Sequence, residues 1–237
     1  ENQLFSDKVK GYSDFYKACK ENGYDPTKEP VPVKPIVHYS NGGVLVGKHG
    51  ETLYEGGRGI VRLYFIGEVA YTGLHGADRF PSNSGPEAVL FGRRAAWHFL
   101  ETKHPEARVK IPLWNKRNAT EPKDAALMNY YIETIQNTMG NLCGIIRTSE
   151  RLIDAKAMMA TLQGQIHGFY RRNLVDELSL TARGMLDVAN PILESALLRS
   201  SSIGCHYRAD FPRHNPNHHA WSVVQKGREP YFMPVPK

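Results

Sequence analysis

Three apolar stripes with helical spacing, in the second half of the chain, constrain the fold more than any other feature of the sequence. They consist of Leu127, Tyr131, Ile135, Thr138 and Leu142, of Leu152, Ala155, Met159, Leu162, Ile166 and Phe169, and of Leu178, Ala182, Met185, Ala189, Ile192 and Ala196. Steps of three and four place each set on one face of a helix. Three such faces can bury one another, so the sequence predicts an antiparallel three-helix bundle within residues 123–212.

The first part of the chain follows other patterns. An amphipathic helix is expected at 12–22, and the prolines between 26 and 35 exclude a further helix because each one removes a backbone donor. Val37–Tyr39 and Val44–Val46 are expected to pair as strands around a glycine turn. Ile60–Ile66 is expected to be a buried strand, because it is rich in β-branched and aromatic residues.

A second helix is expected at 86–101. Ser84 and Glu87 have the spacing of a capping box, in which the serine caps free amides and the glutamate reaches back to the start of the helix. Strands before this helix and a helical bundle after it make the fold class α+β.

Composition narrows the functional classes. The net charge of +6 is compatible with an acidic ligand, but the basic residues are scattered, which does not favour nucleic-acid binding. No apolar run approaches the roughly 18 residues of a membrane helix. Three isolated cysteines indicate a reducing compartment, either cytoplasm or an organelle matrix of the mitochondrion or plastid. The histidines at 214, 218 and 219 are interpreted as part of a solvated tail, so no metal site is predicted.

Polar side chains occur among glycines in two segments. His38 stands just before Gly42 and Gly43, and the run from Gly67 to Arg79 contains Glu68, His75 and several glycines. Glycines let the backbone approach a ligand closely. An arginine offers a planar fork for a carboxylate, and free amides at a helix start favour an anion. These segments are therefore candidates for an anion-binding site.

The same segments resemble a known family. His38-Tyr39 with Gly42-Gly43, then Gly67-Glu68, His75-Gly76 with Arg79, and Ser82-Asn83-Ser84 are similar in order and spacing to the L-aspartate oxidase family, which is related to the flavoprotein subunits of succinate dehydrogenase and fumarate reductase. The proline-rich lead-in at 25–35 and the segments 142–147 and 199–206 extend the resemblance over most of the chain. It implies oxidation of L-aspartate to iminoaspartate with FAD, a step that feeds NAD biosynthesis.

The resemblance also implies roles for single residues. His38 and Arg79 would be catalytic and would bind the substrate carboxylates, and His75 would be a further substrate ligand. The cofactor would be bound by Glu68 and by the start of the helix after it, at Asn83, Ser84 and Gly85.

This sequence departs from the family pattern in several places. Asp78 and Ile203 replace residues that are usually asparagine and arginine, and Pro86 lacks an amide hydrogen that could be donated to a flavin. No Gly-x-Gly-x-x-Gly motif follows a predicted strand. The chain is therefore interpreted as the C-terminal half of such an enzyme, which would need a separate N-terminal FAD-binding half and would not hold FAD alone.

The domain organisation follows from this resemblance. Residues 1–34 would be a remnant of a capping domain and a lead-in, 35–101 the C-terminal part of the FAD-binding and substrate-binding domain, and 102–122 a linker. The bundle domain would occupy 123–212, and 213–237 would be an extended tail. Two alternatives stay open: a catalytically inactive structural subunit of a larger assembly, derived from the oxidase, and a fragment of a succinate dehydrogenase-type flavoprotein.

Overall fold

The computed structural model describes residues 11–35, 37–53, 59–103, 110–113, 119–122, 124–216 and 219–235. The chain forms two compact units, 1–36 and 37–237. The first unit contains α2 (Ser13–Glu21), which agrees with the helix expected at 12–22, and no helix follows it among the prolines. Two expected features lie partly outside the described residues: the linker, at 104–109 and 114–118, and the tail histidines, at His218.

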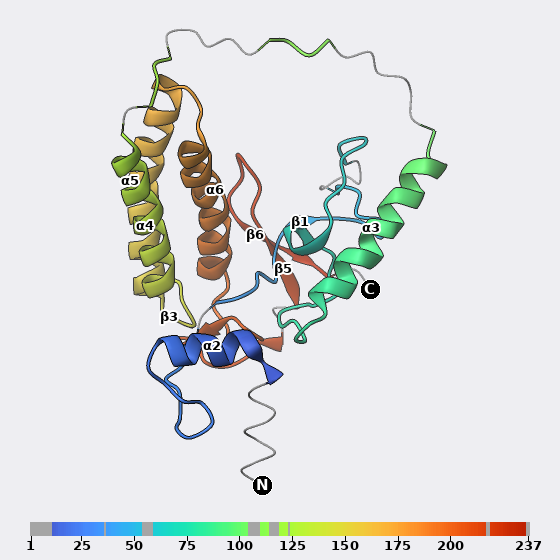
Figure 1. Ribbon diagram of the computed structural model, residues 1–237. Coiled ribbons are helices and arrows are strands. Elements are labelled where there is room, and N and C mark those ends of the chain that lie inside the picture. The colour runs from blue at the N-terminus through green and yellow to red at the C-terminus, as the bar shows by residue number, and fades with distance from the viewer. Residues whose placement is uncertain are drawn as a thin grey trace. The chain divides into compact units, whose positions relative to one another are not determined.

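Three long helices of the second unit pack around one shared core. They are α4 (Ala125–Leu142), α5 (Ser149–Arg172) and α6 (Glu177–Leu198), each of which contacts the other two (Figure 1). Each begins at a side-chain cap: the oxygens of Asp124, Thr148 and Asp176 accept from backbone amides of the first turn. These caps satisfy amides that the helix itself leaves unpaired.

The core contains most of the side chains that the apolar stripes predict. The whole stripe of α5 is buried, from Leu152 to Phe169. On α6 the most deeply buried row includes Leu186 and Leu193, whereas Met185 and Ile192 are partly buried. The buried row of α6, Ala182, Leu186, Ala189, Leu193 and Ala196, also repeats in steps of four and three, so Met185 and Ile192 lie beside it.

The strands differ from those that the sequence predicts. β1 (Val44–Leu45) pairs in parallel with β2 (Ala70–Tyr71), not with Val37–Tyr39. Ile60–Ile66 is not a strand: Tyr64 makes one isolated bridge to Glu51, and Arg62 has a φ of 68° that interrupts extended backbone. Ile60 and Val61 are mostly exposed. β propensity produces a strand only where a neighbour offers a run of backbone partners. Here pairing is limited to two backbone bonds around the bridge, from Thr52 to Leu63 and from Phe65 to Gly50.

Two further pairs of strands complete the second unit. β3 (Ile146–Arg147) and β4 (Tyr207–Arg208) pair in parallel, and β5 (Ala220–Val223) and β6 (Tyr231–Pro234) form an antiparallel hairpin beside α6 (Figure 1). The segment expected to be an extended tail is therefore largely a hairpin. Trp221 holds it in place, because its ring packs edge-on against Tyr71 at 5.4 Å between centroids.

α3 (Ser84–Glu101) carries the candidate site at its start and confirms the expected second helix. It packs on the short 3-10 helix η1 (Gly67–Val69). Within the described residues, no helix is long and apolar enough to cross a membrane. All three cysteines are free thiols.

Candidate functional site

The residues singled out by the sequence lie on three segments that meet at the start of α3. The glycine turn at 42–43 lies against the loop after η1, because a Cβ at Gly43 would be 2.6 Å from the carbonyl oxygen of Val69. Gly43 also has a φ of 144°, which side chains rarely allow. This close approach brings the polar residues at 38–41 beside the run that ends at Arg79.

Arg79 has no carboxylate partner in the part of the chain that the structure describes. Its guanidinium carbon lies 4.2 Å from the centre of the Tyr39 ring, and Nη1 donates to the hydroxyl of Ser84 at 3.4 Å. The Nε atom is buried and has no hydrogen-bond partner among the described residues. A buried donor left unpaired is uncommon in folded proteins and calls for an explanation. The arrangement presents a cation that is oriented by an aromatic ring and is not neutralised by an acid.

Glu87 is the residue that the sequence analysis assigned wrongly. The expected capping box does not form: Asn83 is the N-cap, with no side-chain cap bond, and only 2% of Glu87 is exposed. Its carboxylate accepts instead from three side chains, the hydroxyl of Thr72, Nε2 of His75 at 2.8 Å and the hydroxyl of Tyr39 at 3.4 Å. A buried carboxylate is stable only with such donors, so tertiary contacts outcompete the local cap.

The remaining candidates are placed as follows. His38 is exposed and makes no hydrogen bond to another described residue. The nearly buried His75 side chain uses Nε2 for Glu87, which leaves Nδ1 for any other ligand. Oε1 of Glu68 accepts from the backbone amide of Ser40 at 3.0 Å. Gly85 is exposed, and a Cβ added to it would have no atom within 4 Å. In the described part of the chain, no cluster of histidine, cysteine and acidic residues is arranged to bind a metal ion.

A loop after α6 reaches this site, which the sequence did not indicate. The amide of Cys205 donates to the carbonyl of Ala77 at 3.1 Å, and its thiol donates to Asp78 at 3.0 Å. The bond to Asp78 raises the pKa of the Cys205 thiol, and partial burial adds to this shift. Asp78 is thus bound by Cys205 and forms no ion pair with the adjacent Arg79.

Two parts of the chain match families of known proteins. Residues 3–84 match the FAD binding domain family, and residues 132–231 match the family described as fumarate reductase flavoprotein C-term. L-aspartate oxidase 1 of Ralstonia nicotianae is 36% identical over 199 residues, which cover 84% of this chain. The chloroplastic L-aspartate oxidase of Arabidopsis thaliana is 33% identical over 82% of this chain.

Solved structures lead to the same family. E. coli quinol fumarate reductase FrdA matches with a TM-score of 0.69 and 26% identity, over 92% of this chain and 41% of that one. The chain therefore belongs to the flavoprotein family of L-aspartate oxidase, succinate dehydrogenase and fumarate reductase. It spans only about a third of the curated relatives that it matches, 36% of the Ralstonia protein and 31% of the Arabidopsis protein.

Proposed function

We propose that the chain supplies the substrate-facing part of a flavin-dependent L-aspartate oxidase, which converts L-aspartate to iminoaspartate for NAD biosynthesis. It works together with a separate N-terminal FAD-binding half, in a reducing compartment. One observation carries this proposal: Arg79 is oriented by Tyr39 and Ser84, yet among the residues that the structure describes it has an unpaired Nε and no acidic partner. An oriented, unneutralised guanidinium suits a substrate carboxylate, because the two groups can form two parallel hydrogen bonds.

The second carboxylate of the substrate is assigned to His38. This histidine is exposed and unengaged among the described residues, and it directly precedes the tyrosine on which Arg79 lies. Its imidazole can donate one hydrogen bond to an oxygen. Two donors on adjoining segments suit the two carboxylates of aspartate. The role of His75 as a further ligand stays a prediction, and only its Nδ1 is available for it.

The residues present fit only the flavin-facing part of an FAD site. The start of α3 offers the positive end of the helix dipole, and open space surrounds Gly85. Glu68 retains a second carboxylate oxygen for a cofactor hydroxyl. Bound FAD supplies the acceptor for the two electrons removed from aspartate. The chain contributes orientation of the carboxylates and a positive helix end beside the ring, where negative charge gathers.

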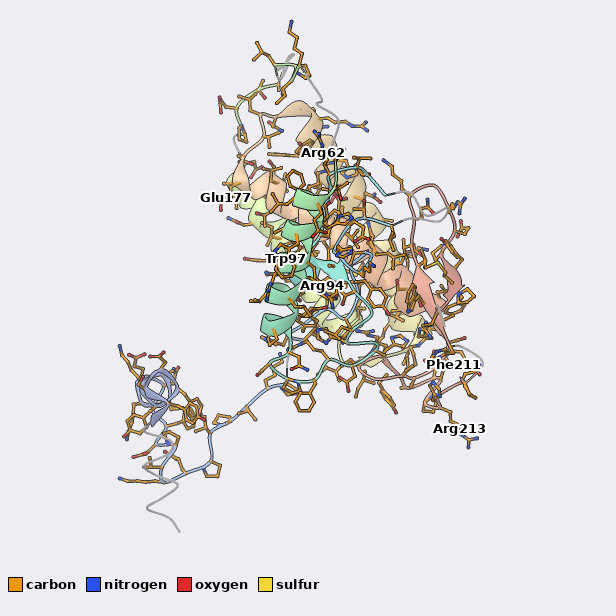
Figure 2. The ribbon with its side chains drawn as sticks, turned by 90° about the vertical axis from the view of Figure 1, so that its right-hand side faces the viewer. Arg62, Arg94, Trp97, Glu177, Phe211 and Arg213 are labelled. Atoms are coloured by element: carbon orange, nitrogen blue, oxygen red, sulfur yellow. The ribbon has the colours of Figure 1, made fainter. Side chains whose placement is uncertain are left out.

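A separate half is supported by the surface of α3. Its inner face holds Phe91 and Ala95, but Val89 is 75% exposed and Leu100 is 78% exposed on the opposite face. Trp97, also on this helix, is about half exposed (Figure 2). A helix that is apolar on both faces is normally buried on both. We assign the covering layer to the FAD-binding half, because the match with this chain covers only 36% of the Ralstonia relative.

The alternative of an inactive structural subunit has support of its own. Pro86 removes a donor at the start of α3, and Ile203 stands where the family usually has an arginine. A decayed site, however, is expected to neutralise Arg79 internally, and Asp78 was the nearest candidate. Asp78 binds Cys205 instead, which favours the enzyme. The third alternative, a fragment of a succinate dehydrogenase-type flavoprotein, remains a proposal of lower rank, because Tyr39-Ser40-Asn41 departs from the dehydrogenase pattern.

The test is to isolate the chain from its native source with everything that stays bound to it. We expect a stoichiometric FAD-binding chain, the visible absorbance of oxidised flavin, and bleaching of that absorbance by L-aspartate without oxygen. Bleaching by succinate alone would favour the dehydrogenase alternative. An assembly without flavin, or with flavin that neither compound reduces, would favour the structural subunit.

A further inference from the structure

The buried carboxylate of Glu87 joins all the segments of the site. It lies in the first turn of α3, and its donors come from the segment before β1 and from the loop that follows β2. We call Glu87, Tyr39, Thr72 and His75 the Glu87 cluster. The three donors lie 12 to 48 residues from Glu87 in sequence, so the cluster fixes tertiary arrangement and not a local turn.

The cluster also fixes the ring on which Arg79 lies. The hydroxyl of Tyr39 donates to Glu87, and the edge of its ring meets the ring of His75 at 5.8 Å between centroids. His75 is itself bonded to Glu87. Tyr39 is therefore held both at its hydroxyl and by the ring of His75, and its face carries the guanidinium of Arg79. Burial raises the pKa of the Tyr39 hydroxyl, and the nearby Glu87 adds to this, so the phenol remains a donor.

Arg79 depends on this ring for much of its orientation. Its other direct contact is the 3.4 Å bond from Nη1 to Ser84, which lies at the upper end of hydrogen-bond distance. An arginine that pairs with no carboxylate has few restraints on its long side chain, and the aromatic face supplies one through its electrostatic attraction for a cation. Movement of the Tyr39 ring would therefore move the guanidinium.

We propose that Glu87 is a positioning residue for Arg79: through Tyr39 and His75 it holds the aromatic platform that orients the guanidinium. It does not touch the substrate. Its consequence for substrate binding rests on the proposed function, whereas its effect on Arg79 does not.

The first test follows the Nε–H group of Arg79 by NMR in the full chain. Nε is buried, so its proton exchanges slowly with water, and loss of the signal in Arg79→Lys assigns it. Glu87→Gln keeps the size of the side chain but removes an acceptor oxygen. We expect proton exchange at Arg79 to become about tenfold faster, because a contact of this kind is worth roughly one order of magnitude. Glu194→Gln is the matched control, since Glu194 is paired with Lys156 on the helical core.

A double-mutant cycle separates positioning from general support of the fold. Tyr39→Phe keeps the ring under Arg79 and removes only the hydroxyl that Glu87 binds. If Glu87 acts through this ring, Glu87→Gln adds little to the change that Tyr39→Phe already causes. Unchanged exchange at Arg79 in Glu87→Gln, or full additivity in the cycle, overturns the proposal. If Glu87→Gln does not fold, Tyr39→Phe decides alone, and unaltered exchange in that variant overturns it.

The native assembly provides a second readout. Glu87→Gln is expected to raise KM for L-aspartate about tenfold and to change kcat little, because a misplaced carboxylate ligand weakens ground-state and transition-state binding alike. A lower kcat with an unchanged KM contradicts the positioning role. If the assembly does not oxidise aspartate at all, the proposed function fails, while the NMR result still decides the role of Glu87.

Discussion

The contact between the loop after α6 and the site provides the sharpest prediction, through Gly204. A Cβ placed on Gly204 would lie 2.3 Å from the carbonyl oxygen of Ala77 and 2.9 Å from its side chain. Ala77 is two residues before Arg79 and accepts the amide of Cys205. The change Gly204→Ala must therefore push apart two segments that are far apart in sequence, one of which carries the arginine.

The expected cost has two parts. Gly204 has a φ of 51°, and holding an alanine in the left-handed region costs about 1–2 kcal/mol. Forcing an extra methyl group against backbone that has little room to move adds about 1–3 kcal/mol. Gly227→Ala separates the two parts, because Gly227 has a φ of 81° but no atom within 4 Å of the added Cβ. That control should show only the first part.

The measurement is equilibrium unfolding in urea, followed by the helical circular dichroism signal of both variants. Gly204→Ala should lose about 1–3 kcal/mol more than Gly227→Ala with an unchanged m-value. The NMR signal of the Arg79 Nε–H group should shift in Gly204→Ala alone. Equal losses in the two variants, or an unmoved Arg79 signal, would refute the argument that this loop buttresses the site.

Three further predictions concern single side chains. In the native assembly, Arg79→Ala should cost about 2–5 kcal/mol of transition-state stabilisation, measured as the loss of kcat/KM for L-aspartate. Arg183 is also stacked on a tyrosine, and Arg183→Ala should leave aspartate turnover unchanged. Arg208 is 1% exposed and is paired with Asp210. Arg208→Ala should lower the free energy of unfolding by about 3–5 kcal/mol, and a loss below about 1 kcal/mol would contradict a structural role for this buried ion pair. Burial lowers the pKa of His206 from 6.5 to about 4. The unfolded chain therefore binds a proton at His206 more readily than the folded chain does. The contribution of this residue to stability is full above pH 6.5 and falls as the pH drops toward 4. In urea unfolding measured at several pH values, His206→Gln should flatten that dependence.

The helical part of the fold could be predicted because its signals are local. The stripe of α5 depends on residues within a few turns of one helix. The strands could not be predicted in the same way. Ile60–Ile66 has the composition of a strand, but a strand also needs a neighbour, and the described chain provides only one isolated bridge. Composition alone does not contain that information.

In the candidate site, too, features that depend on local sequence could be predicted and those that depend on tertiary contacts could not. Motif spacing placed His38, Glu68 and Arg79 on segments that the structure brings to the start of α3. Glu87 was assigned to a capping box because Ser-x-x-Glu before a helix is a local pattern. Its actual partners lie up to 48 residues away, and nothing in its immediate sequence distinguishes a capping glutamate from a buried one. Only the donors that the folded chain brings to Glu87 decide between the two.

The contacts of Asp78 unite these observations. Beside Arg79, a carboxylate would ordinarily form an ion pair and compete with an anionic substrate. The thiol of Cys205 binds this carboxylate instead, and the amide of the same residue binds the preceding turn. The helical part of the protein thus keeps the nearest acid away from the guanidinium, while Tyr39 holds the guanidinium from the other segment. A chain without the loop at 203–206 would retain every motif residue at 38–87, yet Asp78 would be free to turn toward Arg79 and neutralise it.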